Sequence, residues 1–119
     1  MSYTHTGKKP LNITRQPFDA DSTDWVYFVY EDWLRPDEVI TTSEASVVGA
    51  TLVTDSTLIG EMIDDEGVTH TNVYGVQVKP DADSSEITIT HRVSTETLGV
   101  IDLGRLDVDR TVTIAVEVL

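Results

Sequence analysis

The fold of this chain is decided by residues 25–40, which read WVYFVYEDWLRPDEVI and hold five of its eight aromatic side chains. Residues 25–30 form a short β-branched and aromatic run bounded by polar residues, which predicts a strand buried on both faces. Pro36 and Asp37 then predict a turn, because proline presets the backbone for one and aspartate can bond to nearby amides. We expect the core to begin at this strand, with Trp33 and Leu34 covering its end.

Short apolar stretches follow at intervals of about ten residues, with turn residues between them, a spacing typical of a sandwich or barrel. Strands are predicted over residues 39–43, 47–53, 58–63 and 69–78, with a bulge at Gly49 and a hairpin loop at 64–67. The clearest alternation places two sets of side chains on one face each: Ile87, Ile89, His91 and Val93, and later Val112, Ile114, Val116 and Val118. Because no stretch of ten or more residues has helical spacing, the predicted fold class is all-β, a sandwich of about seven antiparallel strands.

Residues 1–24 lack this periodicity and are predicted to form an extended arm, which leaves residues 25–119 as the sandwich domain. The first 16 residues carry three basic side chains and no acidic one, whereas the rest of the chain carries five basic and 21 acidic. Spaced apolar residues in the arm favour a segment laid across a partner's surface, and a frayed terminus remains the alternative. The residues predicted to bind the partner are Lys8, Lys9, Leu11, Ile13, Arg15 and Phe18.

The net charge of −13 argues against a nucleic-acid partner and against an anionic membrane, since both would be repelled. No apolar run approaches the ~20 residues of a membrane span, and no signal peptide follows Met1. The chain has no cysteine, so disulfides and thiol chemistry are excluded. The acidic surface is interpreted as a device for solubility or as adaptation to a salty medium, with a cationic partner as the alternative.

No catalytic, cofactor or metal site is predicted, and the chain is not expected to be an enzyme. Two acidic stretches have the opening spacing of a calcium loop, but both lack the glycine and the glutamate that such a loop needs. Their residues are Asp19, Asp21 and Asp24, and Asp81, Asp83 and Ser85. The three histidines, His5, His70 and His91, lack metal-ligand spacing. His91 is predicted to be a hydrogen-bonded core residue, and no nucleophile with a base is recognisable.

Two segments resemble a group of small immunoglobulin-like proteins encoded among the virion genes of tailed bacteriophages. The first comprises Tyr30, the triplet Asp32-Trp33-Leu34, the acidic pair Asp37-Glu38, and Ile40. The second comprises the alternating strand over residues 87–95 and the arginine-led final strand over residues 109–116. The resemblance covers residues 25–118, and it implies an immunoglobulin-like sandwich.

The resemblance also implies an accessory structural protein of the virion, made in the host cytoplasm and bound to the capsid exterior as a decoration or cement protein. Its expected partners are the major capsid protein or other virion subunits, with a homo-oligomer on the particle also possible. A tail, neck or fibre adaptor is the alternative within this class. From another class, a bacterial surface or carbohydrate-binding module would stack sugars on Tyr3, Trp33 or Tyr74.

Overall fold

A computed structural model describes residues 2–3, 11–15, 18–99, 101 and 103–118, and these residues form strands and no helix. In the described ranges, accordingly, no helix is long and apolar enough to cross a membrane. Seven strands have five residues or more: β2 (Leu11–Arg15), β4 (Asp24–Val29), β5 (Glu38–Val48), β6 (Ala50–Ile63), β7 (Thr69–Pro80), β8 (Glu86–Thr97) and β9 (Val108–Glu117). Two have two residues: β1 (Ser2–Tyr3) and β3 (Phe18–Asp19). The predicted all-β class is therefore confirmed.

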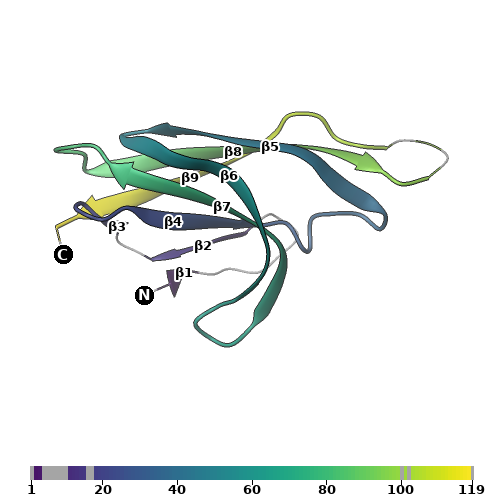
Figure 1. Cartoon of the computed structure of the whole chain (residues 1–119), viewed down its shortest axis with the longest axis horizontal. Coiled ribbons are helices and arrows are strands. Elements are labelled where there is room, and N and C mark those ends of the chain that lie inside the picture. Colours follow the sequence, from purple (N-terminus) through teal and green to yellow (C-terminus); the bar gives the residue numbers. More distant parts are fainter. Residues whose placement is uncertain (1, 4–10, 16–17, 100, 102, 119) are drawn as a thin grey trace.

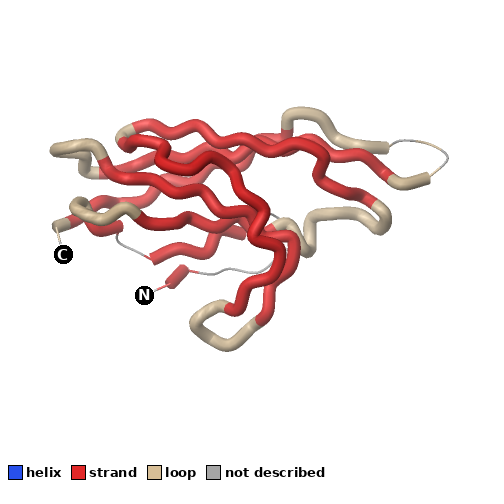
Figure 2. The backbone as a smooth tube through the Cα atoms, in the orientation of Figure 1, coloured by secondary structure: helices blue, strands red, loops and turns tan. Residues whose placement is uncertain are grey.

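The strands form two sheets that pack into a sandwich (Figures 1 and 2). One sheet has the order β1-β2-β4-β7-β6, and the other has the order β3-β9-β8-β5. Neighbouring strands are antiparallel, except that β3 runs parallel to β9. The domain is elongated, 52 × 29 × 19 Å, and the β8–β9 connection lies at the opposite end of its long axis from the C-terminus (Figure 1).

The chain passes from one sheet to the other at Gly49, between β5 and β6. Gly49 has φ +81°, and a Cβ atom there would lie 2.6 Å from the carbonyl oxygen of Glu86, so a side chain would be strained and would clash. The predicted bulge at this glycine is therefore wrong, because Gly49 is a corner between sheets. The strand predicted over residues 47–53 is divided at this corner, since residues 47–48 end β5. Residues 50–53 join the strand predicted over residues 58–63 in one strand, β6, whose register with β7 shifts several times.

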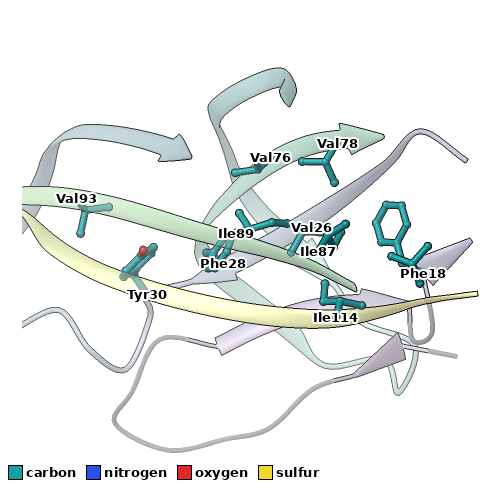
Figure 3. Packing of buried hydrophobic residues seen from close by; sticks show 11 residues of the cluster. Phe18, Val26, Phe28, Tyr30, Val76, Val78, Ile87, Ile89, Val93 and Ile114 are labelled. Carbon is teal, nitrogen blue, oxygen red and sulfur yellow. The ribbon is translucent and has the colours of Figure 1, made fainter. Parts of the chain in front are cut away.

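Alternating residues of both sheets fill the core, as Figure 3 shows with Phe18 toward one end and Val93 and Tyr30 toward the other. The buried members are Phe18, Val26, Phe28, Tyr30, Val76, Val78, Ile87, Ile89, Val93, Ile114 and Val116. The predicted inward face of β8 is confirmed, since Ile87, Ile89, His91 and Val93 are all fully buried. The prediction fails at Val118, which follows β9 and is 80% exposed.

The strand predicted from the aromatic run is present as β4, but only one of its faces reaches the main core. Val26 and Phe28 belong to that core, whereas Val29 packs with Val73 in a small separate cluster. Trp33 and Leu34 are partly buried against the edge of the core. They cover its end, as expected.

The N-terminal boundary predicted at residue 24 needs correction. The backbone of β2 pairs with β4 in one sheet, and β3 pairs with β9 in the other, so residues 11–15 and 18–19 belong to the sandwich. The extended conformation of these residues agrees with the prediction. The surface across which they lie, however, belongs to their own domain and not to a partner. Unpaired backbone groups in an extended segment are satisfied most directly by an adjacent strand, which the apolar spacing alone did not reveal.

Candidate partner-binding surface

The residues predicted to tether a partner do not form one surface among the described residues. Lys8 and Lys9 lie outside the described ranges, and Leu11, Ile13 and Arg15 are described only through the backbone of β2. Phe18 is 3% exposed and belongs to the core. The prediction that Phe18 binds a partner is therefore wrong, because β3 turns this side chain between the sheets.

The connection between β8 and β9 exposes four large apolar side chains. Leu98, Ile101, Leu103 and Leu106 are 61%, 70%, 59% and 82% exposed. Single exposed apolar residues are common on protein surfaces, but a group of this size in one loop marks an interaction site. We call these four residues the apolar loop.

An ion pair anchors the apolar loop to the body of the domain. The guanidinium of Arg105 donates from both Nε and Nη2 to the carboxylate of Glu38, whose side chain is fully buried. Thr95 donates to the same carboxylate at 2.5 Å. The hydrogen bonds from Arg105 outweigh burial and lower the pKa of Glu38 to about 2. This two-bond arrangement holds Glu38 charged and fixes the loop's return to β9.

Trp33 completes the anchor from the other side of Arg105. The guanidinium carbon of Arg105 lies 3.5 Å from the centre of the Trp33 ring, and Nη2 also donates to the Trp33 carbonyl at 3.0 Å. This is a cation–π contact at a partly buried position. The face of Trp33 beneath Arg105 is thus occupied, and Tyr74 packs edge-on against Tyr30.

Hydrogen bonds to backbone groups connect the rest of this connection to the domain and across itself. Arg35 Nη1 donates to the Leu103 carbonyl at 3.1 Å, and the Leu98 amide donates to the Asp37 carbonyl at 2.8 Å. Thr97 Oγ1 bridges the loop, accepting from the Leu103 amide and donating to the Ile101 carbonyl. The described parts of this connection are thus hydrogen-bonded to the body of the domain or to one another, while its four apolar side chains are exposed.

A second group of exposed apolar residues lies on the end of the β6–β7 hairpin, which projects from the sandwich (Figure 1). Ile63 and Val68 are exposed there, and Leu58, farther back on β6 opposite Tyr74, is exposed as well. Just inside this end, the buried ring of His70 lies between two carboxylates, with Nδ1 2.6 Å from Glu31 Oε1 and Nε2 2.8 Å from Asp64 Oδ2. Glu31 belongs to the segment after β4, so these contacts tie the hairpin to that segment. We call His70, Glu31 and Asp64 the hairpin clamp.

Charge holds the hairpin clamp together. Burial would lower the pKa of His70, but its hydrogen bonds to Asp64 and Glu31 outweigh burial and raise it. The same bond to His70 lowers the pKa of Asp64. Because the two carboxylates lie on opposite sides of the ring, they do not converge on one point where a metal ion could sit.

A third polar cluster contains a serine beside a histidine and is the arrangement closest to a catalytic one. His91 is fully buried, with Nδ1 2.5 Å from the Tyr30 hydroxyl and Nε2 2.7 Å from Ser56 Oγ. Ser56 in turn donates to Ser43 Oγ at 2.8 Å. Every hydrogen finds an acceptor if Tyr30 donates to Nδ1 and Nε2–H donates to Ser56. In that tautomer His91 cannot take the serine proton, as a general base would have to.

The two acidic stretches considered for calcium lie close together in space. Asp21, Asp81 and Asp83 line one hollow of about 380 Å³ near the C-terminal end of the domain. Several of these carboxylates serve the backbone instead: Asp19 accepts from the Asp21 amide and Asp24 accepts from the Trp25 amide. No three acidic or histidine side chains within the described part of the chain are grouped to hold a metal ion.

Comparison with protein-family models, with curated proteins and with solved structures found no match to this chain.

Sequence analysis predicted the buried, hydrogen-bonded His91 but missed both anchors of the exposed surfaces. Glu38 and Arg105 are 67 residues apart, and His70 and Glu31 are 39 apart. Their pairing depends on strand order, which single-sequence periodicity does not fix.

Proposed function

We propose that this chain is a non-enzymatic structural protein of a tailed-phage virion, which docks on the outside of the capsid as a decoration or cement protein. The virion assignment rests on the sequence resemblance of residues 25–118. The docking role rests on one observation, the apolar loop held in place by the Arg105–Glu38 ion pair.

The strand order supports the immunoglobulin-like part of this proposal. When the strands are lettered in chain order, β2-β4-β7-β6 corresponds to A-B-E-D and β9-β8-β5 corresponds to G-F-C, the two sheets of a constant-type domain. The parallel strand β3 then continues strand A beside strand G. In that lettering the four residues of the apolar loop lie in the F–G connection, one of the loops that variable-type immunoglobulin domains use for recognition.

The energetics of the apolar loop favour docking on a protein. Burying its side chains against a partner would contribute about 25 cal/mol per Å² of apolar surface. Hydrogen bonds already hold the described ends of the loop to the body of the domain, which reduces the ordering cost of docking. A partner with an apolar recess and basic surroundings fits this surface, since the chain around it is acidic.

Localisation on purified particles tests the proposal. Tailed particles from the strain that encodes this chain would be purified, analysed by peptide mass spectrometry, and labelled with gold-coupled antibody against the chain. We expect the chain at a constant ratio to the major capsid protein, with gold over the capsid. Gold over the tail, neck or fibres would favour the adaptor alternative, and absence of the chain from particles would refute a virion role.

A matched pair of variants tests the docking surface itself. The double variant Leu103→Ser/Leu106→Ser should fail to rebind particles that lack the protein, while Val48→Ser, equally exposed but on β5, should rebind normally. Equal rebinding by both variants would show that another surface makes the contact. Circular dichroism would confirm that both remain folded.

A further inference from the structure

The strand β9 has one side that few described residues cover. The Val116 amide donates to the Ser85 carbonyl at 2.9 Å, so the backbone of Val116, and of every second residue before it, faces β8. The intervening residues, Asp109, Thr111, Thr113 and Ala115, direct their backbone N–H and C=O groups to the opposite side. On that side the described chain offers only β3, which pairs with Val116 and Glu117.

Thr111 and Thr113 have no backbone partner on this side among the described residues, whereas the carbonyls at both ends of the strand have one. The carbonyl of Glu117 accepts from the Ala20 amide at 2.8 Å, and the carbonyl of Asp109 accepts from Arg110 Nη1 at 2.9 Å. Between these two positions lie Ala115, which is next to β3, and then Thr113 and Thr111. No described strand pairs with the outward N–H and C=O groups of the two threonines, so they form a short ladder to which another strand can bind.

The other long edges of the sandwich are protected. On β5 the amide of Ala45 donates to Asp55 Oδ1 at 2.8 Å, which blocks that edge with a charged side chain. On β6 repeated register shifts break the regular ladder. By contrast, β9 pairs with β8 without a shift and contains no proline, glycine or lysine. Its middle residues, 111–113, are uncharged and regularly paired with β8, so this part of the strand lacks the features with which proteins usually prevent edge pairing.

We infer that β9 pairs antiparallel with β9 of a second copy of this chain, about a two-fold axis at Val112. The sequence Thr111-Val112-Thr113 reads the same in both directions, so Thr111 of each copy meets Thr113 of the other and all their outward groups become hydrogen-bonded. The side chains fit as well, because β8 and β9 already make two such threonine pairs at 3.1 Å. The result is one continuous sheet through both copies.

Charge supports a second copy as the occupant. Within residues 109–115 the chain has one acidic and one basic residue, so this edge is neutral on a protein of net charge −13. In the proposed register Asp109 faces Ala115 and Arg110 faces Ile114 of the second copy. Since β3 occupies the edge at Val116 and Glu117, the pairing ends before these residues. Both copies carry a net charge of −13, so added salt should strengthen the association. The inference does not depend on the virion assignment.

A cysteine at the axis gives a direct test. The two Val112 residues would form a non-hydrogen-bonded pair with Cα atoms roughly 4.5 Å apart, within the range that a disulfide spans. Because the chain has no cysteine, Val112→Cys introduces a single thiol. Under mild oxidation we expect Val112→Cys to form linked dimers about tenfold or more faster than the control Val48→Cys, since pairing raises the local thiol concentration.

Proline at position 113 supplies a second, independent measurement. Proline is tolerated in an edge strand where its missing N–H faces outward, so Thr113→Pro should fold while blocking the pairing. Sedimentation of the unmodified chain should show concentration-dependent dimers that increase with salt, and Thr113→Pro should abolish them. Equal linking of the two cysteine variants, or a chain that remains monomeric or dimerises regardless of Thr113→Pro, would overturn the inference.

Discussion

His91 and His70 are both buried in this domain, yet their surroundings shift their pKa values in opposite directions. His91 lies between the hydroxyls of Tyr30 and Ser56, and burial lowers its pKa to about 4, against a smaller opposing effect of Asp55. His70 lies between the carboxylates of Glu31 and Asp64, and its pKa is raised. Partners rather than depth of burial therefore decide the direction in which the pKa of each histidine moves.

The difference between the histidines corresponds to a difference between two regions. The neutral His91 belongs to the core, where its ring stacks on Phe28 at 4.8 Å, and it joins β8 to β6 through Ser56. The charged His70 ties the projecting hairpin to the segment after β4. We therefore expect changes at His91 to affect the whole domain and changes at His70 to act mainly on the hairpin.

Removing the His91 ring should have the largest effect. His91→Ala would leave a cavity beside Phe28 and would deprive the buried Tyr30 hydroxyl of its acceptor, at a cost of about 3–5 kcal/mol. Urea unfolding monitored by tryptophan fluorescence measures the loss. Ser46→Ala, on an exposed position of β5, is the control and should change little. A loss below about 1 kcal/mol for His91→Ala would contradict its place in the core.

Acid should weaken the domain through the same residue. A folded pKa of about 4 lies below the ordinary value of about 6.5, so between these values the unfolded chain binds a proton that the folded chain does not. Stability is therefore lost as pH falls, by about 2 kcal/mol between pH 7 and pH 5. His91→Gln should remove this part of the slope. Parallel pH profiles for both proteins would show that other groups cause the acid sensitivity.

Local pattern predicted those parts of the fold that depend on local chemistry. Alternation located β8 and β9, the aromatic run located β4, and turn residues located the β6–β7 hairpin. Pattern failed at Gly49, because a glycine at a corner between sheets has the same sequence signature as one in a bulge. It also failed at β2 and β3, since whether an extended segment pairs with its own domain depends on open edges far away in sequence.

The candidate site was harder to predict because its members meet only in three dimensions. Arg105 reads as one charge in a loop, and Glu38 as one acid after a turn. The exposed Leu98, Ile101, Leu103 and Leu106 could equally have been core residues of a further hairpin. Only the three-dimensional arrangement shows that this connection lies at one end of the sandwich, away from the core between the sheets (Figure 1).

Removing the Ser56 hydroxyl, which contacts His91 in the core, should lower the free energy of unfolding by an intermediate amount. In the tautomer described above, His91 donates from Nε2 to Ser56, so Ser56→Ala leaves a buried N–H without an acceptor. We expect a loss of about 1.5 kcal/mol in urea unfolding. Ser56→Thr, which keeps the hydroxyl, is the matched control. The loss should appear equally at every slowly exchanging amide, and a loss limited to β6 would show that Ser56 does not support the core.

Releasing the hairpin clamp should have the smallest effect on global stability. His70→Gln retains a donor for one carboxylate but removes the positive charge between Glu31 and Asp64, at a cost of about 1 kcal/mol. Because the raised pKa of His70 stabilises the fold fully below about pH 6.5 and less as pH rises through the folded value, the loss should shrink in alkaline solution.

Hydrogen exchange of the His70→Gln variant, resolved by residue, should show faster exchange over residues 57–70 and little change in β8. Glu66→Gln removes a charge from the same turn without touching His70 and should leave exchange unaltered. If His70→Gln instead destabilised the domain as much as His91→Ala, the hairpin would be part of the cooperative core and the contrast between the two histidines would not hold.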